Sequence, residues 1–157
     1  MSGDISSMLN LGVRSAGAAH WSRQQYERLF AAGEGHAQSE PSAWVVVRDA
    51  GEPTDPAAGE QSGVVAFLVA HKIDREWELE NIVVADAFRR RGLARLLLGS
   101  LITQAREERG ASIFLEVRES NQSARALYRN AGFEDTGLRK RYFADPAEDA
   151  VLCTLRL

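Results

Sequence analysis

The sequence predicts a single α/β domain, residues 1–157, in which helices pack on both faces of a mixed β-sheet. Two observations lead to this prediction. Three strand-like segments follow one another in the first half of the chain, which is typical of an antiparallel meander. The second half alternates strand-like and helix-like segments, and a strand–helix–strand unit there implies a parallel pair joined by a right-handed crossover.

The first half is predicted from the spacing of its apolar residues. Residues 5–9 keep helical spacing, although Gly12 weakens this helix, and residues 22–30 indicate a second amphipathic helix that Ser22 can cap. The meander strands, rich in β-branched residues, cover residues 44–47, 64–71 and 76–84. Residues 49–63 hold two of the four prolines and three glycines, which predicts a long loop.

The second half is predicted from its alternation of strands and helices. A helix over residues 92–108 is followed by a strand over 113–117 and a helix over 121–131. Strands over 133–138 and 150–157 complete the sheet. In the first of these helices one buried stripe is expected to hold Leu93, Leu96, Leu97 and Leu101.

Composition argues against several classes of protein. Lys+Arg 19 against Asp+Glu 22 gives a net charge of −3, whereas a general nucleic-acid binder is normally basic. The single cysteine, Cys153, allows no internal disulfide and is expected to be a core thiol, and the histidines show no metal-ligand spacing. The sequence has no apolar run of about 18–20 residues and no signal peptide. We therefore expect a cytoplasmic protein without metal, membrane or nucleic-acid partner.

The strongest local feature is an arginine-rich turn between a predicted strand and a long helix. Four arginines stand within the seven residues 89–95 and provide bidentate donors for an anion. Gly92 and the small Ala94 let an anion approach the N–H groups at the helix start, where the helix dipole favours negative charge. The turn predicts a phosphate or pyrophosphate site, although it lacks the Gly-Lys-Ser/Thr of a Walker loop. The alternative is a solvated basic helix start.

A second pattern opens the following helix. Asn121 can cap this helix, and helical periodicity places Ala124 and Tyr128 on roughly the same face as Asn121. Taken alone, Tyr128 is interpreted as a packed aromatic side chain. The two patterns together, Arg-x-x-Gly-x-Ala at 89–94 and Asn-x-x-Ala-x-x-Leu-Tyr-x-x-x-Gly-Phe at 121–133, resemble the GNAT superfamily of acetyl-CoA-dependent N-acetyltransferases.

Further segments resemble the bacterial ribosomal-protein N-terminal-alanine acetyltransferases within that superfamily. These are residues 115–121, Arg141-Tyr142-Phe143, Glu148-Asp149-Ala150 and Trp21-Ser22. The resemblance implies a GNAT-like fold whose central parallel strands splay apart, with acetyl-CoA as co-substrate and a protein N-terminus as partner. One departure is that the subgroup opens with a strand, whereas residues 1–10 are too helical for one.

The resemblance also implies a role for each site residue. Cofactor binding falls to the strand backbone at Ile82, Val83 and Val84, to the turn at Arg89, Arg90, Arg91, Gly92, Leu93, Ala94 and Arg95, and to Asn121. Glu116 takes the place of the general base and Tyr128 that of the general acid. Glu78, Glu80 and Tyr142 border the groove for the acceptor amine.

The acceptor's chemistry is compatible with a carboxylate base. An α-amine has a pKa near ~8, so deprotonating it at pH 7 costs only about 1.4 kcal/mol, against about 4.6 kcal/mol for a lysine. Glu76, Glu78 and Glu80 share one face of their strand, and Glu78 stands where other branches of the superfamily carry a catalytic glutamate. The choice between Glu116 and Glu78 as base therefore stays open. A small-molecule acceptor and a non-catalytic acyl-CoA-binding module remain alternatives.

Overall fold

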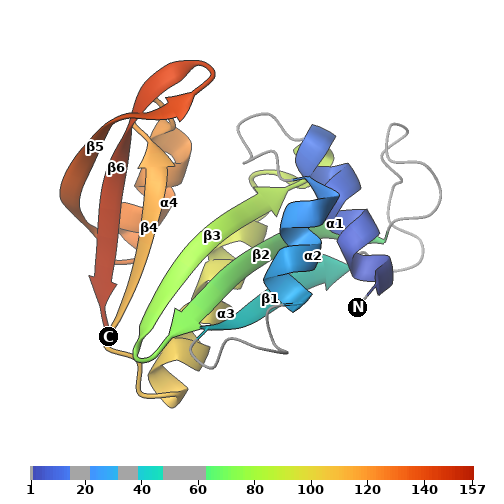
Figure 1. Cartoon of the computed structure of the whole chain (residues 1–157), viewed down its shortest axis with the longest axis horizontal. Coiled ribbons are helices and arrows are strands. Elements are labelled where there is room, and N and C mark those ends of the chain that lie inside the picture. Colours follow the sequence, from blue (N-terminus) through green and yellow to red (C-terminus); the bar gives the residue numbers. More distant parts are fainter. Residues whose placement is uncertain (1, 15–21, 32–38, 48–62) are drawn as a thin grey trace.

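The structure is a computed structural model that describes residues 2–14, 22–31, 39–47 and 63–157. Its core is a six-stranded sheet of order β1-β2-β3-β4-β6-β5 (Figure 1). The strands are β1 (Ser39–Val47), β2 (Val64–Ile73), β3 (Glu76–Val84), β4 (Ser112–Arg118), β5 (Glu134–Ala144) and β6 (Ala147–Arg156). The helices are α1 (Ser2–Arg14), α2 (Arg23–Ala31), the 3-10 turn η2 (Asp86–Phe88), α3 (Leu93–Glu107) and α4 (Gln122–Asn130).

The sheet is mixed, as the sequence predicts. β1, β2 and β3 form an antiparallel meander, and β3 pairs with β4 in parallel. This parallel ladder covers only Glu76–Leu79 of β3, after which the two strands diverge (Figure 1). β4 then pairs along its whole length with β6. The edge of β3 beyond Leu79 is therefore left without a neighbouring strand on that side.

Helices cover both faces of the sheet (Figure 1). Met8 of α1 and Tyr26 of α2 are buried against Phe67 and Val83 on one face. α3 and α4 cover the other face, where the larger part of the core lies. Among the described residues, no helix is long and apolar enough to span a membrane.

Two helix predictions are met and one is corrected. Ser22 caps α2 in a reciprocal box, because its Oγ accepts from the N–H of Gln25 at 3.3 Å while its own N–H donates to Gln25 Oε1 at 2.7 Å. The N-terminal residues form helix α1 rather than a strand. The expected stripe of α3 is wrong at Leu96, which is 59% exposed, because Leu98 faces the core instead.

Several strands are longer than predicted. β1 begins at Ser39 because Pro41 lies on the edge strand of the sheet, where a missing N–H costs little. β5 extends to Ala144 and pairs with β6 in a long hairpin. Nearly all side chains of β5 are exposed, so its sequence lacks the apolar alternation that marks a strand. The predicted loop over residues 49–63 lies outside the described residues except for Gly63. Trp21 also lies outside them.

Candidate active site

The arginine-rich turn joins the end of β3 to the start of α3. Gly92 caps α3 with a φ of 82°, a left-handed backbone that glycine adopts without strain. Arg90 has a φ of 62°, which is uncommon for a residue with a side chain and is found at functional sites. Arg89 forms an ion pair with Asp86 at 2.7 Å. This backbone presents the N–H groups at the start of α3 toward one side of the sheet.

A cleft of about 630 Å³ lies beside this turn. It brings together nine of the eleven predicted cofactor-binding residues, which are residues 82–84 of β3, Arg89, Arg90, Gly92, Ala94 and Arg95 of the turn, and Asn121 before α4. The other two lie elsewhere. The Arg91 guanidinium carbon is 4.8 Å from the centroid of the Phe88 ring, and Leu93 packs against the core.

The cleft fits an extended chain that ends in a phosphate group. The edge of β3 at residues 82–84 is free of β4, so its main chain can pair with an extended amide-bearing ligand, as an added strand would. The turn contributes Arg89, Arg90 and Arg95 at the N-terminus of a 15-residue helix, where anions are favoured. These are the donor groups that the pantetheine arm and pyrophosphate of acetyl-CoA require.

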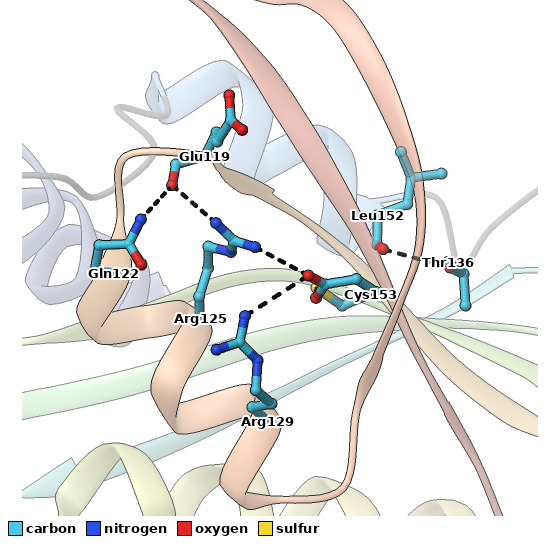
Figure 2. Close-up of polar contacts among 8 residues, drawn as sticks. Glu119, Gln122, Arg125, Arg129, Thr136, Leu152 and Cys153 are labelled. Carbon is cyan, nitrogen blue, oxygen red and sulfur yellow. Dashed lines mark hydrogen bonds and ion pairs between the residues drawn. The ribbon is translucent and has the colours of Figure 1, made fainter.

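Asn121 has a structural role that is visible without a ligand. Its Oδ1 accepts from the N–H of Ala124 at 3.1 Å and thereby caps α4. Arg125 fixes the other side of this helix (Figure 2), since it donates to the main-chain oxygen of Glu119 at 3.3 Å and to Asp135 at 2.9 Å. Cys153 is buried behind Asp135, and burial raises the pKa of its thiol to about 11, as expected of a core thiol.

The predicted base and acceptor residues meet where β3 and β4 separate. Glu78 faces Phe114 in the last part of the ladder, and Glu116 lies two residues further along β4. Glu116 forms an ion pair with Arg139 of β5, and the Arg139 guanidinium lies 4.6 Å from the centroid of the Tyr142 ring. The hydrogen bond to Glu116 raises the pKa of Tyr142 to about 12, because the phenol donates to the carboxylate. A carboxylate and its two donors thus form one wall.

Glu78 and Glu80 form the opposite wall on β3. Burial raises the pKa of Glu78, and the negative charges of Glu80 and Glu116 raise it further, against smaller opposing effects of His71 and Arg139. His71 Nδ1 lies 3.3 Å from Glu80 Oε1. This crowding of like charges would be relieved by a cationic amine placed between the two strands.

Tyr128 lies in the core rather than in the open cleft. It is 5% exposed and its ring packs 5.8 Å from that of Phe133, so a packed aromatic side chain describes it correctly. It clusters with Leu115 and Val117, whose side chains alternate with that of Glu116 along β4. Tyr128 and Glu116 therefore lie on opposite faces of β4. Burial raises the pKa of Tyr128, which keeps the phenol protonated.

The sequence interpretation assigned no site role to several residues that the structure brings to the cleft or to Glu116. Arg118 and Ser120 line the cleft, and Arg139 holds Glu116. Arg139 belongs to the basic run Arg139-Lys140-Arg141, and a run of exposed charges gives no indication of which strand lies opposite. Arg118 stood within a segment quoted for its resemblance, but only the sheet pairing brings it to the cleft.

Comparison with known proteins defines the class. The sequence model of the acetyltransferase (GNAT) family matches residues 8–133, more than half of the chain. The chain therefore belongs to the acetyltransferase (GNAT) family of enzymes, and its fold is the one predicted.

Two sequence relatives and one solved structure show which individual proteins this chain is similar to. The chain is 37% identical over 101 residues, 62% of this chain and 70% of the relative, to the [Ribosomal protein bS18]-alanine N-acetyltransferase of Haemophilus ducreyi. It is 44% identical over 84 residues, 54% of this chain, to an uncharacterized protein of Mycobacterium leprae, of which the match covers 23%. The crystal structure of the ribosomal-protein-S18-alanine N-acetyltransferase from Escherichia coli superposes with a TM-score of 0.78, 26% identity and coverage of 99% of this chain and 89% of that one.

Gly92→Glu is expected to abolish detectable acetyl-CoA binding. The substitution places a carboxylate at the predicted pyrophosphate position and a side chain at a φ of 82°. A Cβ at Gly92 would meet no heavy atom within 4 Å, so the substitution strains the backbone at the helix start without a steric clash, and circular dichroism checks that the protein is folded. Isothermal titration calorimetry with acetyl-CoA measures the effect, and Gly99→Glu on the same helix is the control. Unchanged affinity in a folded Gly92→Glu protein would show that the cofactor site is misplaced.

Proposed function

We propose that this chain is an acetyl-CoA-dependent N-acetyltransferase that transfers acetyl directly to the α-amine of a protein N-terminus. Alanine at the start of a small-subunit ribosomal protein is the first candidate acceptor, since the names of two similar proteins specify this amine. The observation on which the proposal rests is the acidic gap where β3 and β4 separate, which is formed by Glu78, Glu80 and Glu116.

The residues of the cleft bind and orient the donor. Acetyl-CoA supplies an activated acetyl thioester when it is bound. The turn at residues 89–95 would hold the pyrophosphate, and the free edge of β3 at residues 82–84 would align the pantetheine arm along the strand. This direction leads from the turn toward the point where β3 and β4 separate, and so toward Glu116.

The residues of the gap handle the protons. Glu116 would accept, directly or through water, the proton that the acceptor ammonium loses to become the attacking amine, while Arg139 and Tyr142 fix the position of its carboxylate. Glu78 and Glu80 would attract the cationic amine from the opposite wall. Tyr128 would donate a hydrogen bond to the departing thiolate, because its buried phenol remains protonated.

A panel of acceptors tests the proposal. Peptides of ten residues that differ only in their first residue are compared with the same peptides blocked at the α-amine and carrying a free lysine, and with free polyamines. CoA release is measured, and mass spectrometry locates the acetyl group. We expect acetylation of the free α-amine and a preference for alanine. Acetylation of polyamines alone would overturn the proposal in favour of a small-molecule acceptor, and binding of acetyl-CoA without transfer would favour a binding module.

The cytoplasmic location stays a prediction.

A further inference from the structure

The side chain of Arg118 joins the cofactor cleft to the β5–β6 hairpin. Arg118 ends β4 and lines the cleft. Its Nη1 donates to the main-chain oxygen of Pro146 at 3.1 Å and to Glu148 Oε2 at 3.2 Å, and its Nη2 donates to the main-chain oxygen of Asp145 at 3.0 Å. The guanidinium also lies 4.1 Å from the centroid of the Phe143 ring. All these contacts are to the turn of the hairpin and the residues beside it.

The backbone after β4 is tied to the same hairpin. The N–H of Ser120 donates to Glu148 Oε1 at 2.5 Å, and the N–H of Glu119 donates to the main-chain oxygen of Asp149 at 3.2 Å. These bonds from Ser120, with the Arg118 guanidinium, hold the pKa of Glu148 below its usual range. Glu148 therefore stays ionised at neutral pH, and its carboxylate bridges Arg118 and Ser120, which both line the cofactor cleft.

The β5–β6 hairpin also carries part of the acceptor wall, which consists of Glu116 of β4 and the two β5 residues that contact it, Arg139 and Tyr142. Asp149 Oδ1 accepts from the N–H of Arg141 at 2.8 Å, where the backbone has a φ of 53°. The next residue is Tyr142, whose ring packs edge-on against Phe143 with 5.1 Å between centroids. Two routes of contact therefore end at Tyr142. One runs from Arg118 through the Phe143 ring. The other runs from Glu148 to its neighbour Asp149, which binds the N–H of Arg141 beside Tyr142. Tyr142 and Arg139 are the groups that hold Glu116.

We propose that Arg118 is a positioning residue for the acceptor amine: with Glu148 it fixes the β5–β6 hairpin so that Arg139 and Tyr142 reach Glu116. The proposal rests on the proposed function, because it takes Glu116 and Tyr142 as the acceptor side of the site. It also gives a physical reason why the segment around Arg118 and the segment Glu148-Asp149-Ala150 occur together in this sequence. The two segments are the two halves of one joint between the cofactor cleft and the acceptor wall.

Glu148→Gln is the central test, because Glu148 is not among the residues that line the cleft and contacts it only through Arg118 and Ser120. We expect the KM for the acceptor to rise about tenfold, from the loss of charge-assisted hydrogen bonds, while the calorimetric affinity for acetyl-CoA stays within about threefold. Arg118→Met is expected to show the same rise in acceptor KM. Arg129→Met is the matched control and is expected to leave both quantities unchanged, because Arg129 is an exposed arginine on α4 whose guanidinium forms an ion pair with Asp135.

Two further measurements distinguish positioning from other roles. In a Tyr142→Ala background the effect of Glu148→Gln on acceptor KM is expected to shrink, because both changes act through one residue. Hydrogen–deuterium exchange of residues 139–149 is expected to accelerate in Glu148→Gln and not in Arg129→Met. If Arg118→Met weakens acetyl-CoA binding while Glu148→Gln changes neither exchange nor KM, Arg118 serves the cofactor and the joint is refuted. If the wild-type protein acetylates none of the amines tested, the proposed function fails. The exchange measurement still shows whether Glu148 fixes the β5–β6 hairpin.

Discussion

Glu116→Gln is expected to lower kcat by about 100-fold or more, because an amide of the same shape cannot accept the proton of the attacking amine. The side chain is 16% exposed at the mouth of the gap, within reach of an acceptor. The substitution also removes the ion pair with Arg139, but that guanidinium is more than half exposed, so the fold is expected to tolerate the loss. The measurement is kcat over a pH series, with circular dichroism as the check of folding.

Glu78→Gln is the matched comparison on the opposite wall. We expect it to change kcat by only a few-fold and to act mainly on acceptor KM. Since the pKa of Glu78 is raised, its charge is lost at a higher pH than that of an ordinary carboxyl group as the solution is acidified. The wild-type acceptor KM should therefore rise as pH falls through this raised pKa, and the rise should be absent in Glu78→Gln. The opposite result would assign the base to β3. In that case Glu78→Gln would lower kcat and remove the rise of kcat with pH on the acidic side of the profile, whereas Glu116→Gln would keep both.

Tyr128→Phe is expected to lower kcat by roughly 10²–10⁴-fold, with acetyl-CoA affinity within about twofold of wild type. The hydroxyl is needed only as negative charge develops on the leaving sulfur, so its removal affects the transition state more than the bound donor. Because burial raises the pKa of Tyr128, the phenol remains neutral through the assay range, and the loss should be independent of pH between 6 and 9.

A second buried tyrosine serves as the control for Tyr128→Phe. Tyr26 lies in α2 on the other face of the sheet, packed against Phe67, and burial raises its pKa to about 12. Tyr26→Phe removes a similarly buried hydroxyl, which shares a hydrogen bond with Asn81 of β3 on the face of the sheet opposite Tyr128. It is expected to keep its kcat, because no step of the proposed reaction uses that hydroxyl. Single-turnover kinetics on both variants separate the chemical step from product release. A Tyr128→Phe protein within twofold of the wild-type rate would remove Tyr128 from the mechanism and leave it as the packed aromatic that its burial also describes.

The cleft that we assign to the cofactor was predictable from the sequence because its residues are close together in the chain. Arg89, Arg90, Gly92 and Arg95 lie within one turn at a helix start, and the physics of anion binding there depends on neighbours in the chain. The same holds for Asn121, whose capping bond reaches only three residues ahead. Residues 82–84 needed one further inference, that the parallel strands splay, which came from the resemblance.

The acceptor side depends on contacts that are distant in sequence. Glu116 meets Arg139, 23 residues away, because β4 and β5 both pair with β6, and the two side chains reach each other across that strand. Neither side of exposed β5 carries an apolar pattern, so the position of Tyr142 could not be derived from periodicity. Arg118 and Glu148 lie 30 residues apart in the sequence, and nothing near either residue distinguishes it from an ordinary surface charge.

The most direct test of the account is the affinity of a bisubstrate ligand in which the sulfur of CoA is joined through an acetyl group to the α-amine of an alanine-initiated peptide. If the donor cleft and the acceptor gap meet where β3 and β4 separate, this ligand should bind at least 100-fold more tightly than acetyl-CoA or the peptide alone, because one association joins both sets of contacts. The gain should disappear in Gly92→Glu and shrink in Tyr142→Ala. An affinity equal to that of acetyl-CoA, unaffected by Tyr142→Ala, would contradict the account by showing that no peptide N-terminus reaches the gap.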